Sequence, residues 1–214
     1  MSMIVNLFGP VSGKIKLTRN CNITKLSGYN VINMKVPGGN YSDLHACNLK
    51  TKNGYIMENI WQSCKVHESI PAYKYKKHGT LIWKHKAETH MENGIIKDSY
   101  FAWKEKLIKN KYPVLYPCGY SNRNKYQFLL NNNKKYNYND GFYNIYLPMY
   151  FDLIKNKERF NELHYRINKG ENVLIICDNL PYKEIEFNIV NKNHVFYSSG
   201  YCLALALLKK FNIY

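Results

Sequence analysis

The feature that most constrains the fold is a run of apolar residues from Val173 to Cys177. A continuous, β-branched-rich run of this kind is typical of a strand that is buried in a sheet. Asp178 follows the run directly. Because open α/β sheets bind ligands at the carboxyl ends of their strands, Asp178 is a candidate functional carboxylate.

The remaining pattern mixes strands and helices without a regular β-α-β alternation, which predicts an α+β fold. We expect a single domain, residues 1–214, in which several helices pack on a small mixed sheet. Further strands are expected at Met3–Phe8, Lys14–Thr18 and Tyr29–Val36. Helices are expected at Met57–Val66, Asp98–Lys109 (capped by Asp98), Phe142–Leu153 (kinked or begun by Pro148), Phe160–Ile167 (stopped by Gly170) and Tyr201–Lys210 (capped by Ser198 or Ser199). The polar tract Asn131–Asn139 is expected to be an exposed loop.

The chain is strongly basic: 31 lysines and arginines against 15 acidic residues give a net charge of +16. Such an excess favours a polyanionic partner, although an A/T-rich coding genome would also enrich lysine. Lysines alternate with tyrosines at Tyr73–Lys77 and Lys134–Tyr136, a pattern suited to phosphate binding and base stacking. One functional interpretation is therefore a non-catalytic DNA- or RNA-binding or virion-associated protein.

Other classes are disfavoured by what the sequence lacks. The six cysteines are scattered without a C-x-x-C pair, so we expect no zinc or redox site and no cofactor. The amino terminus has no secretory pattern, and the longest apolar run, Tyr201–Leu208, is too short to cross a bilayer. We expect an intracellular protein with no membrane partner.

His85 and His90 flank Glu88 at a spacing unlike a helical zinc site, so they either line a pocket or lie in a solvated segment.

The most informative stretch runs from Gly54 to Lys65. On a helix, Glu58, Gln62 and Lys65 fall at i, i+4 and i+7 on one face, with Trp61 at its border. A carboxylate, an amide and an ammonium beside an aromatic ring can hold a polar ring and stabilise a cation. Spacing alone, however, favours the solvent side of an amphipathic helix.

This stretch resembles the YbiA-like NADAR superfamily, whose members are N-glycosidases acting on ribosylated guanine-type bases and ADP-ribose adducts. The family places a glycine before a Glu-x-aromatic-aromatic-Gln-x-x-Lys helix, and Glu58, Trp61, Gln62 and Lys65 match its later positions. The last helix, beginning near Gly200, is similar to the closing helix of the family. The glycine-to-glutamate interval is shorter here, the Trp-Gly loop of the family is absent, and residues 68–172 are a divergent or inserted middle.

The resemblance implies cleavage of a ribosyl C1′–N bond in a nucleotide or ADP-ribosylated guanine, possibly within nucleic acid. Glu58 would be the catalytic carboxylate, and Asp178 is our candidate second acid. Candidate substrate-binding residues are Asp43, Trp61, Gln62, Lys65, His90, Arg123, Lys125 and Gly200.

Overall fold

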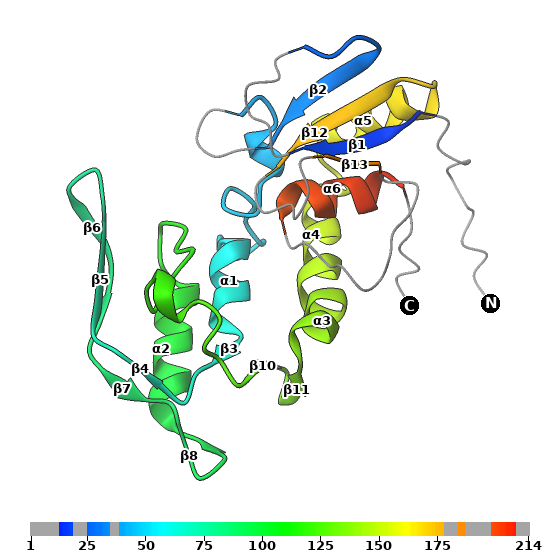
Figure 1. Cartoon of the computed structure of the whole chain (residues 1–214). Helices are drawn as coiled ribbons and strands as arrows, with labels where there is room; N and C mark the ends of the chain where they lie inside the picture. Colours follow the sequence, from blue (N-terminus) through cyan, green and yellow to red (C-terminus); the bar gives the residue numbers. More distant parts are fainter. Residues whose placement is uncertain (1–12, 19–24, 35–38, 178–183, 187–197, 209–214) are drawn as a thin grey trace. The chain divides into compact units, whose positions relative to one another are not determined.

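The computed structural model describes residues 13–18, 25–34, 39–177, 184–186 and 198–208 (Figure 1). It is a mixed α+β structure with several small sheets, which confirms the predicted fold class. Its contacts divide the chain into two compact units: residues up to 45 together with residues from 154 onward form unit 1, and Ala46–Leu153 forms unit 2. These bounds differ from the expected divergent middle of residues 68–172, and the expectation of a single domain stays a prediction.

Unit 1 is built on a four-stranded mixed sheet. Its strands are β1 (Ile15–Thr18), β2 (Tyr29–Asn33), β12 (Asn172–Ile176) and β13 (Glu184–Glu186). The order is β13-β1-β12-β2, with β12 parallel to both neighbours and β13 antiparallel to β1. Residues Val173 to Ile176 are at most 1% exposed, so the buried strand predicted from its apolar run is confirmed. Asp178 and the expected strand Met3–Phe8 lie outside the described residues.

In unit 1, the end of one helix and the start of another follow the predicted signals. In α5 (Glu158–Asn168), Gly170 takes a φ of 93° and donates its N–H to the Ile167 carbonyl, which ends the helix at the predicted glycine. In α6 (Ser199–Leu207), the Ser198 hydroxyl accepts a hydrogen bond from the Tyr201 N–H at 3.2 Å. All of α6 is buried, and it packs on β1 and β12. A short 3₁₀ turn, η1 (Ser42–Leu44), also belongs to this unit.

Unit 2 combines helices with short antiparallel strand pairs. Its helical elements are α1 (Met57–Ser63), α2 (Asp98–Ile108), η2 (Tyr120–Asn122), α3 (Tyr138–Gly141), the π-helical η3 (Phe142–Tyr146) and most of α4 (Leu147–Ile154). Its strands are β3 (Lys65–Val66), β4 (Ser69–Ile70), β5 (Tyr73–Lys77), β6 (Thr80–His85), β7 (Glu88–Thr89), β8 (Met91–Glu92), β9 (Ile95–Ile96), β10 (Phe128–Asn131) and β11 (Lys134–Tyr136). They form the sheet β11-β10-β3 and the pairs β4-β7, β5-β6 and β8-β9.

The core of unit 2 forms where α1 and α2 pack together. The Tyr100 hydroxyl of α2 donates to the Ser63 carbonyl of α1 at 2.9 Å, which satisfies a buried polar group at the helix end. The surrounding cluster is rich in aromatic and branched side chains and consists of Val66, Ile70, Trp83, Tyr100, Trp103, Leu107, Val114, Cys118 and Leu130.

Three predicted element boundaries in unit 2 are wrong. The helix expected at Met57–Val66 ends at Ser63, because Lys65 and Val66 pair with β10 instead. The tract expected to be a loop at Asn131–Asn139 contains a β-hairpin, since Asn132 and Asn133 accept the positive φ angles that its turn requires. The N-cap of α2 is Lys97 rather than Asp98, which lies in the first turn.

The expected helix at Phe142–Leu153 is distorted beside Pro148. Pro148 lies in the first turn of α4, where its missing N–H is tolerated, and the residues before it adopt a π-helix. The chain stays helical without a gap from Tyr138 through Ile154, so Pro148 distorts a continuous helix and does not set its start.

Gly200 allows α6 to approach β12 closely, so we expect Gly200→Ala to destabilise the protein. An alanine Cβ at this position would lie 2.3 Å from the Cys177 Cβ. Overpacking of this kind costs about 1–3 kcal/mol, which outweighs the gain of about 1 kcal/mol from helix propensity. Urea unfolding measures the change. The control Asn161→Ala, at an exposed position of α5, should alter stability by only a few tenths of a kcal/mol. Equal or higher stability of Gly200→Ala would contradict the packing account.

Candidate functional site

The backbone before α1 positions the candidate catalytic helix. Gly54 adopts a φ of 80° in the turn that precedes it, a conformation that favours glycine. Ile56 occupies the N-cap and has no polar side chain to accept from the helix. Instead, the N–H of Met57 donates to the Leu49 carbonyl at 2.9 Å and that of Glu58 to the Ala46 carbonyl at 3.3 Å. These bonds satisfy two free N–H groups of the helix start.

The polar face of α1 is buried, so its assignment to the solvent side of an amphipathic helix is wrong. Glu58 is 6% exposed and Gln62 is 8% exposed. The Gln62 Nε2 donates a hydrogen bond of 2.7 Å to Glu58 Oε1, as expected for side chains at i and i+4. Lys65 is also only 6% exposed, although it lies on β3 rather than on the helix. The structure therefore buries all three predicted polar residues in the same unit.

The charges of Glu58 and Lys65 influence each other. Burial raises the pKa of Glu58, while the hydrogen bond from Gln62 and the positive charge of Lys65 oppose the rise. Burial lowers the pKa of Lys65, and the negative charge of Glu58 opposes that fall. Because each charge favours the ionised form of the other, the two groups partly offset the cost of their desolvation.

Aromatic rings surround this polar cluster. The Lys65 Nζ lies 5.5 Å from the centre of the Tyr126 ring, a cation–π distance. The Trp61 ring centre is 5.8 Å from that of Tyr138 and 5.1 Å from that of Tyr146. Tyr126 and Tyr138 are themselves 6.0 Å apart. The ring planes are inclined to one another by 51°, 69° and 40°, so the rings pack in the tilted and edge-on arrangements of an aromatic cluster. The three tyrosines were not predicted as site residues, because they lie more than 60 residues from Glu58 in the sequence.

Asn59 is a buried polar residue of α1 with a structural role that the sequence pattern did not reveal. Its Nδ2 donates to the carbonyls of Asn110 and Tyr112, at 3.1 and 2.9 Å. Its Oδ1 accepts from the Val114 N–H at 2.8 Å. These bonds attach the loop after α2 to α1. The asparagine inside a predicted helix could have indicated this role. Asparagine disfavours helix interiors unless its side-chain amide has hydrogen-bond partners.

A cleft of about 790 Å³ in unit 2 is lined by residues that include His67, Glu88 and Lys125. The His67 Nδ1 donates to the Lys125 carbonyl at 3.0 Å, and the His67 ring centre is 6.1 Å from that of Tyr126. Tyr126 therefore contacts both this cleft residue and Lys65 of the Glu58 cluster. Among the predicted substrate-binding residues, Lys125 lines the cleft.

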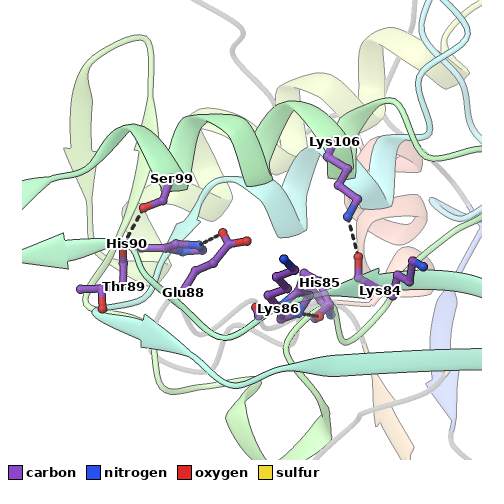
Figure 2. Close-up of polar contacts among 9 residues, drawn as sticks. Lys84, His85, Lys86, Glu88, Thr89, His90, Ser99 and Lys106 are labelled. Atoms are coloured by element: carbon purple, nitrogen blue, oxygen red, sulfur yellow. Dashed lines mark hydrogen bonds and ion pairs between the residues drawn. The ribbon is translucent and has the colours of Figure 1, made fainter.

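His90 is fully buried, which excludes a solvated segment at this position. Its Nε2 lies 3.6 Å from a carboxylate oxygen of Glu88 (Figure 2). Its ring packs against those of Tyr100 and Trp103, with centres 5.7 and 5.1 Å away. Burial lowers the pKa of His90, and the Glu88 charge opposes the fall. Within the described residues, His90 belongs to the aromatic core, whereas Glu88 and Thr89 beside it line the cleft.

The other predicted site residues lie apart from these groups or in unit 1. Arg123 contacts Tyr120, with its guanidinium 3.7 Å from the ring centre. Asp43 lies 3.4 Å from Arg159 within unit 1, and both side chains are about half exposed. Gly200 packs on Cys177 in the same unit. Asp178 lies outside the described residues.

Among the described residues, no group of three or more His, Cys, Asp and Glu side chains could hold a metal ion. No helix in the described part of the chain combines the length and the apolar character needed to cross a membrane.

No protein-family description, curated protein or solved structure matches the chain.

We expect protonation of His67 to destabilise the protein as the pH falls. Burial lowers the pKa of His67 from 6.5 to about 4, so its contribution to stability is complete above pH 6.5 and is lost as the pH falls toward 4. A shift of this size corresponds to about 3 kcal/mol. Urea unfolding between pH 7.5 and 4 measures the loss.

The matched variant is His67→Asn, whose amide can still donate to the Lys125 carbonyl but does not ionise. We expect it to show a smaller acid-induced loss of stability than the wild type. Identical pH profiles of the two proteins would refute the role of His67.

Proposed function

We propose that the protein is an N-glycosidase-like hydrolase that cleaves the C1′–N bond of a ribosylated or ADP-ribosylated guanine-type base. The proposal rests chiefly on the buried Glu58 carboxylate, which accepts a hydrogen bond from Gln62 and lies in the field of Lys65. A buried carboxylate with a raised pKa, held by a specific hydrogen bond and a nearby charge, is the kind of group that acid–base catalysis uses.

The proposed role of Glu58 follows from the transition state. As the C1′–N bond breaks, its electron pair leaves with the base and positive charge develops on the ribose. An ionised Glu58 would stabilise that charge or take a proton from the water whose oxygen bonds to C1′. Its hydrogen bond from Gln62 would hold the carboxylate in one orientation, so that little reorganisation is needed during reaction.

The neighbouring residues would bind and orient the substrate. The Lys65 ammonium would bind a phosphate or the leaving base, and Trp61 would stack on the base or wall the site. The Trp61 ring contacts the Tyr138 ring, and the Tyr126 ring lies against the Lys65 ammonium. Glu58, Gln62 and Lys65 each keep between 6 and 8% exposure, so none is sealed completely from solvent.

We expect Glu58→Gln to abolish most of the activity while leaving the fold intact. Loss of a positioned acid or base lowers turnover by roughly 10²–10⁴-fold. Burial raises the pKa of Glu58 above 4.5, so its contribution to stability is lost as the pH rises through that raised value. The amide does not ionise, but it also leaves the buried Lys65 without its opposite charge. Because these effects oppose each other, we expect the stability at pH 7 to change by less than about 1 kcal/mol. The assays are release of ADP-ribose or ribose phosphate from ADP-ribosylated guanine, free and in DNA, and urea unfolding.

The matched control is Glu105→Gln, an exposed glutamate of α2 that pairs with Lys109 at the surface. It should retain wild-type turnover. No product from the wild type on either substrate, or full activity of Glu58→Gln, would remove the glycosidase proposal.

For Lys65→Ala we expect mainly a higher apparent KM. If the ammonium binds a phosphate equally in the ground and transition states, its loss weakens binding, and kcat falls only as far as the higher pKa of Glu58 lowers the ionised fraction of that carboxylate. Steady-state kinetics on the same substrates separate the two parameters. An equal fall of kcat and kcat/KM would instead assign Lys65 to the transition state.

A further inference from the structure

The pair β5-β6 forms a two-stranded antiparallel ribbon with a tight tip (Figure 1). At the tip, His78 and Gly79 take φ angles of 50° and 81°, as a two-residue hairpin turn requires. The strands shift register between Tyr75 and Lys76, which marks a β-bulge. Bulges increase local twist, so the end of the ribbon is not a flat edge.

One side of the ribbon is attached to the rest of unit 2. The Trp83 Nε1 donates to the Pro117 carbonyl at 2.8 Å, and the His85 Nε2 lies 2.8 Å from the same oxygen. The Lys106 Nζ of α2 donates to the Lys84 carbonyl at 2.6 Å, as Figure 2 shows. The base of the ribbon is thereby held by buried groups, and its position relative to α2 is defined.

The ribbon carries only positive charge. No acidic residue occurs between Ser69 and Ala87, whereas the same stretch contains five lysines. All five are exposed: Lys74, Lys76, Lys77, Lys84 and Lys86. Lys74 lies directly opposite Lys84 in the strand register. Like charges at directly opposite positions destabilise a β-ladder, so the ribbon itself gains nothing from this pair. A bound polyanion would place negative charge beside both ammonium groups and so offset the repulsion between them.

We propose that the β5-β6 ribbon inserts into the major groove of duplex DNA, with its lysines bound to the phosphates. The major groove of B-DNA admits a two-stranded β-ribbon, whereas the major groove of A-form RNA is too narrow. Single-stranded nucleic acid is bound mainly by stacking on several exposed rings. In the ribbon Trp83 is buried and Tyr73 is half-buried, so Tyr75, at 39% exposure, is the one exposed tyrosine or tryptophan of its two strands, beside four exposed lysines. This inference is independent of the glycosidase proposal, because it involves none of the Glu58 cluster.

The first test is the salt dependence of binding to a 20-base-pair duplex of random sequence, measured by fluorescence anisotropy. Each lysine–phosphate contact contributes about 0.9 to the slope of log K against log salt concentration. The triple variant Lys74→Gln, Lys76→Gln, Lys77→Gln should therefore reduce the slope by about 2.7. The control carries the same charge change at exposed positions off the ribbon: Lys50→Gln, Lys52→Gln and Lys111→Gln. It should keep a slope closer to that of the wild type.

The second test separates binding from folding by reversing one charge. Lys74→Glu places a carboxylate opposite Lys84, so the melting temperature should hold or rise. Loss of one phosphate contact should nevertheless weaken duplex binding at 50 mM salt by at least about tenfold.

Three results would overturn the proposal. They are absence of wild-type binding at 50 mM salt, equal slopes for the two triple variants, and tighter binding of single-stranded DNA or duplex RNA than of duplex DNA. None of these outcomes bears on release of ADP-ribose by the Glu58 cluster, so the two proposals fail separately.

Discussion

Burying a carboxylate in a protein is costly unless hydrogen bonds and an opposite charge replace the water that it loses. Unit 2 meets this requirement at Glu58 through the Gln62 amide and the nearby charge of Lys65. The rest of α1 depends on the same principle, because Asn59 bonds three backbone groups of the loop after α2. A short helix can therefore be polar along most of its length and still lie inside the unit.

The placement of Lys65 on β3 makes this arrangement possible. If α1 continued through Lys65, this residue would lie on the helix, on the same face as Gln62, and would not belong to a strand. Instead the chain leaves the helix after Ser63, and β3 pairs with β10 in the sheet next to Tyr126. The tyrosine ring then contacts the ammonium from a segment about 60 residues further along the chain. The polar cluster and the aromatic cluster beside it both depend on this strand pairing.

The lysines of unit 2 differ in their exposure to solvent. Lys65 is nearly inaccessible and its charge acts on Glu58, whereas the four lysines of the β5-β6 ribbon and Lys86 beside it are exposed. The net charge of +16 therefore includes at least two kinds of lysine, and only the exposed kind can contact a large polyanion. A/T-rich codon usage would enrich lysine along the whole chain, and residues 1–42 and 106–139 also lack acidic residues. The case for the ribbon therefore rests on the exposure of its lysines and on the placement of Lys74 opposite Lys84.

The sequence by itself determined the elements whose signals are local. The apolar run Val173–Cys177, the cap at Ser198 and the stop at Gly170 all follow from periodicity or from the chemistry of one residue. The polar composition of Asn131–Asn139 predicted a loop, and this prediction was wrong. Asn132 and Asn133 instead form the turn of a β-hairpin.

Only the tertiary structure decided the environment of the candidate site. Spacing predicted the pairing of Glu58 with Gln62, but it placed Lys65 on the helix and favoured the solvent side for a face that is buried. Tyr126, which contacts Lys65, and Tyr138, which contacts Trp61, belong to distant segments. The period of a helix carries no information about which segments will pack on it. Burial, the direction of each pKa shift and the aromatic cluster arise from those long-range contacts, so they become visible only when the chain is folded.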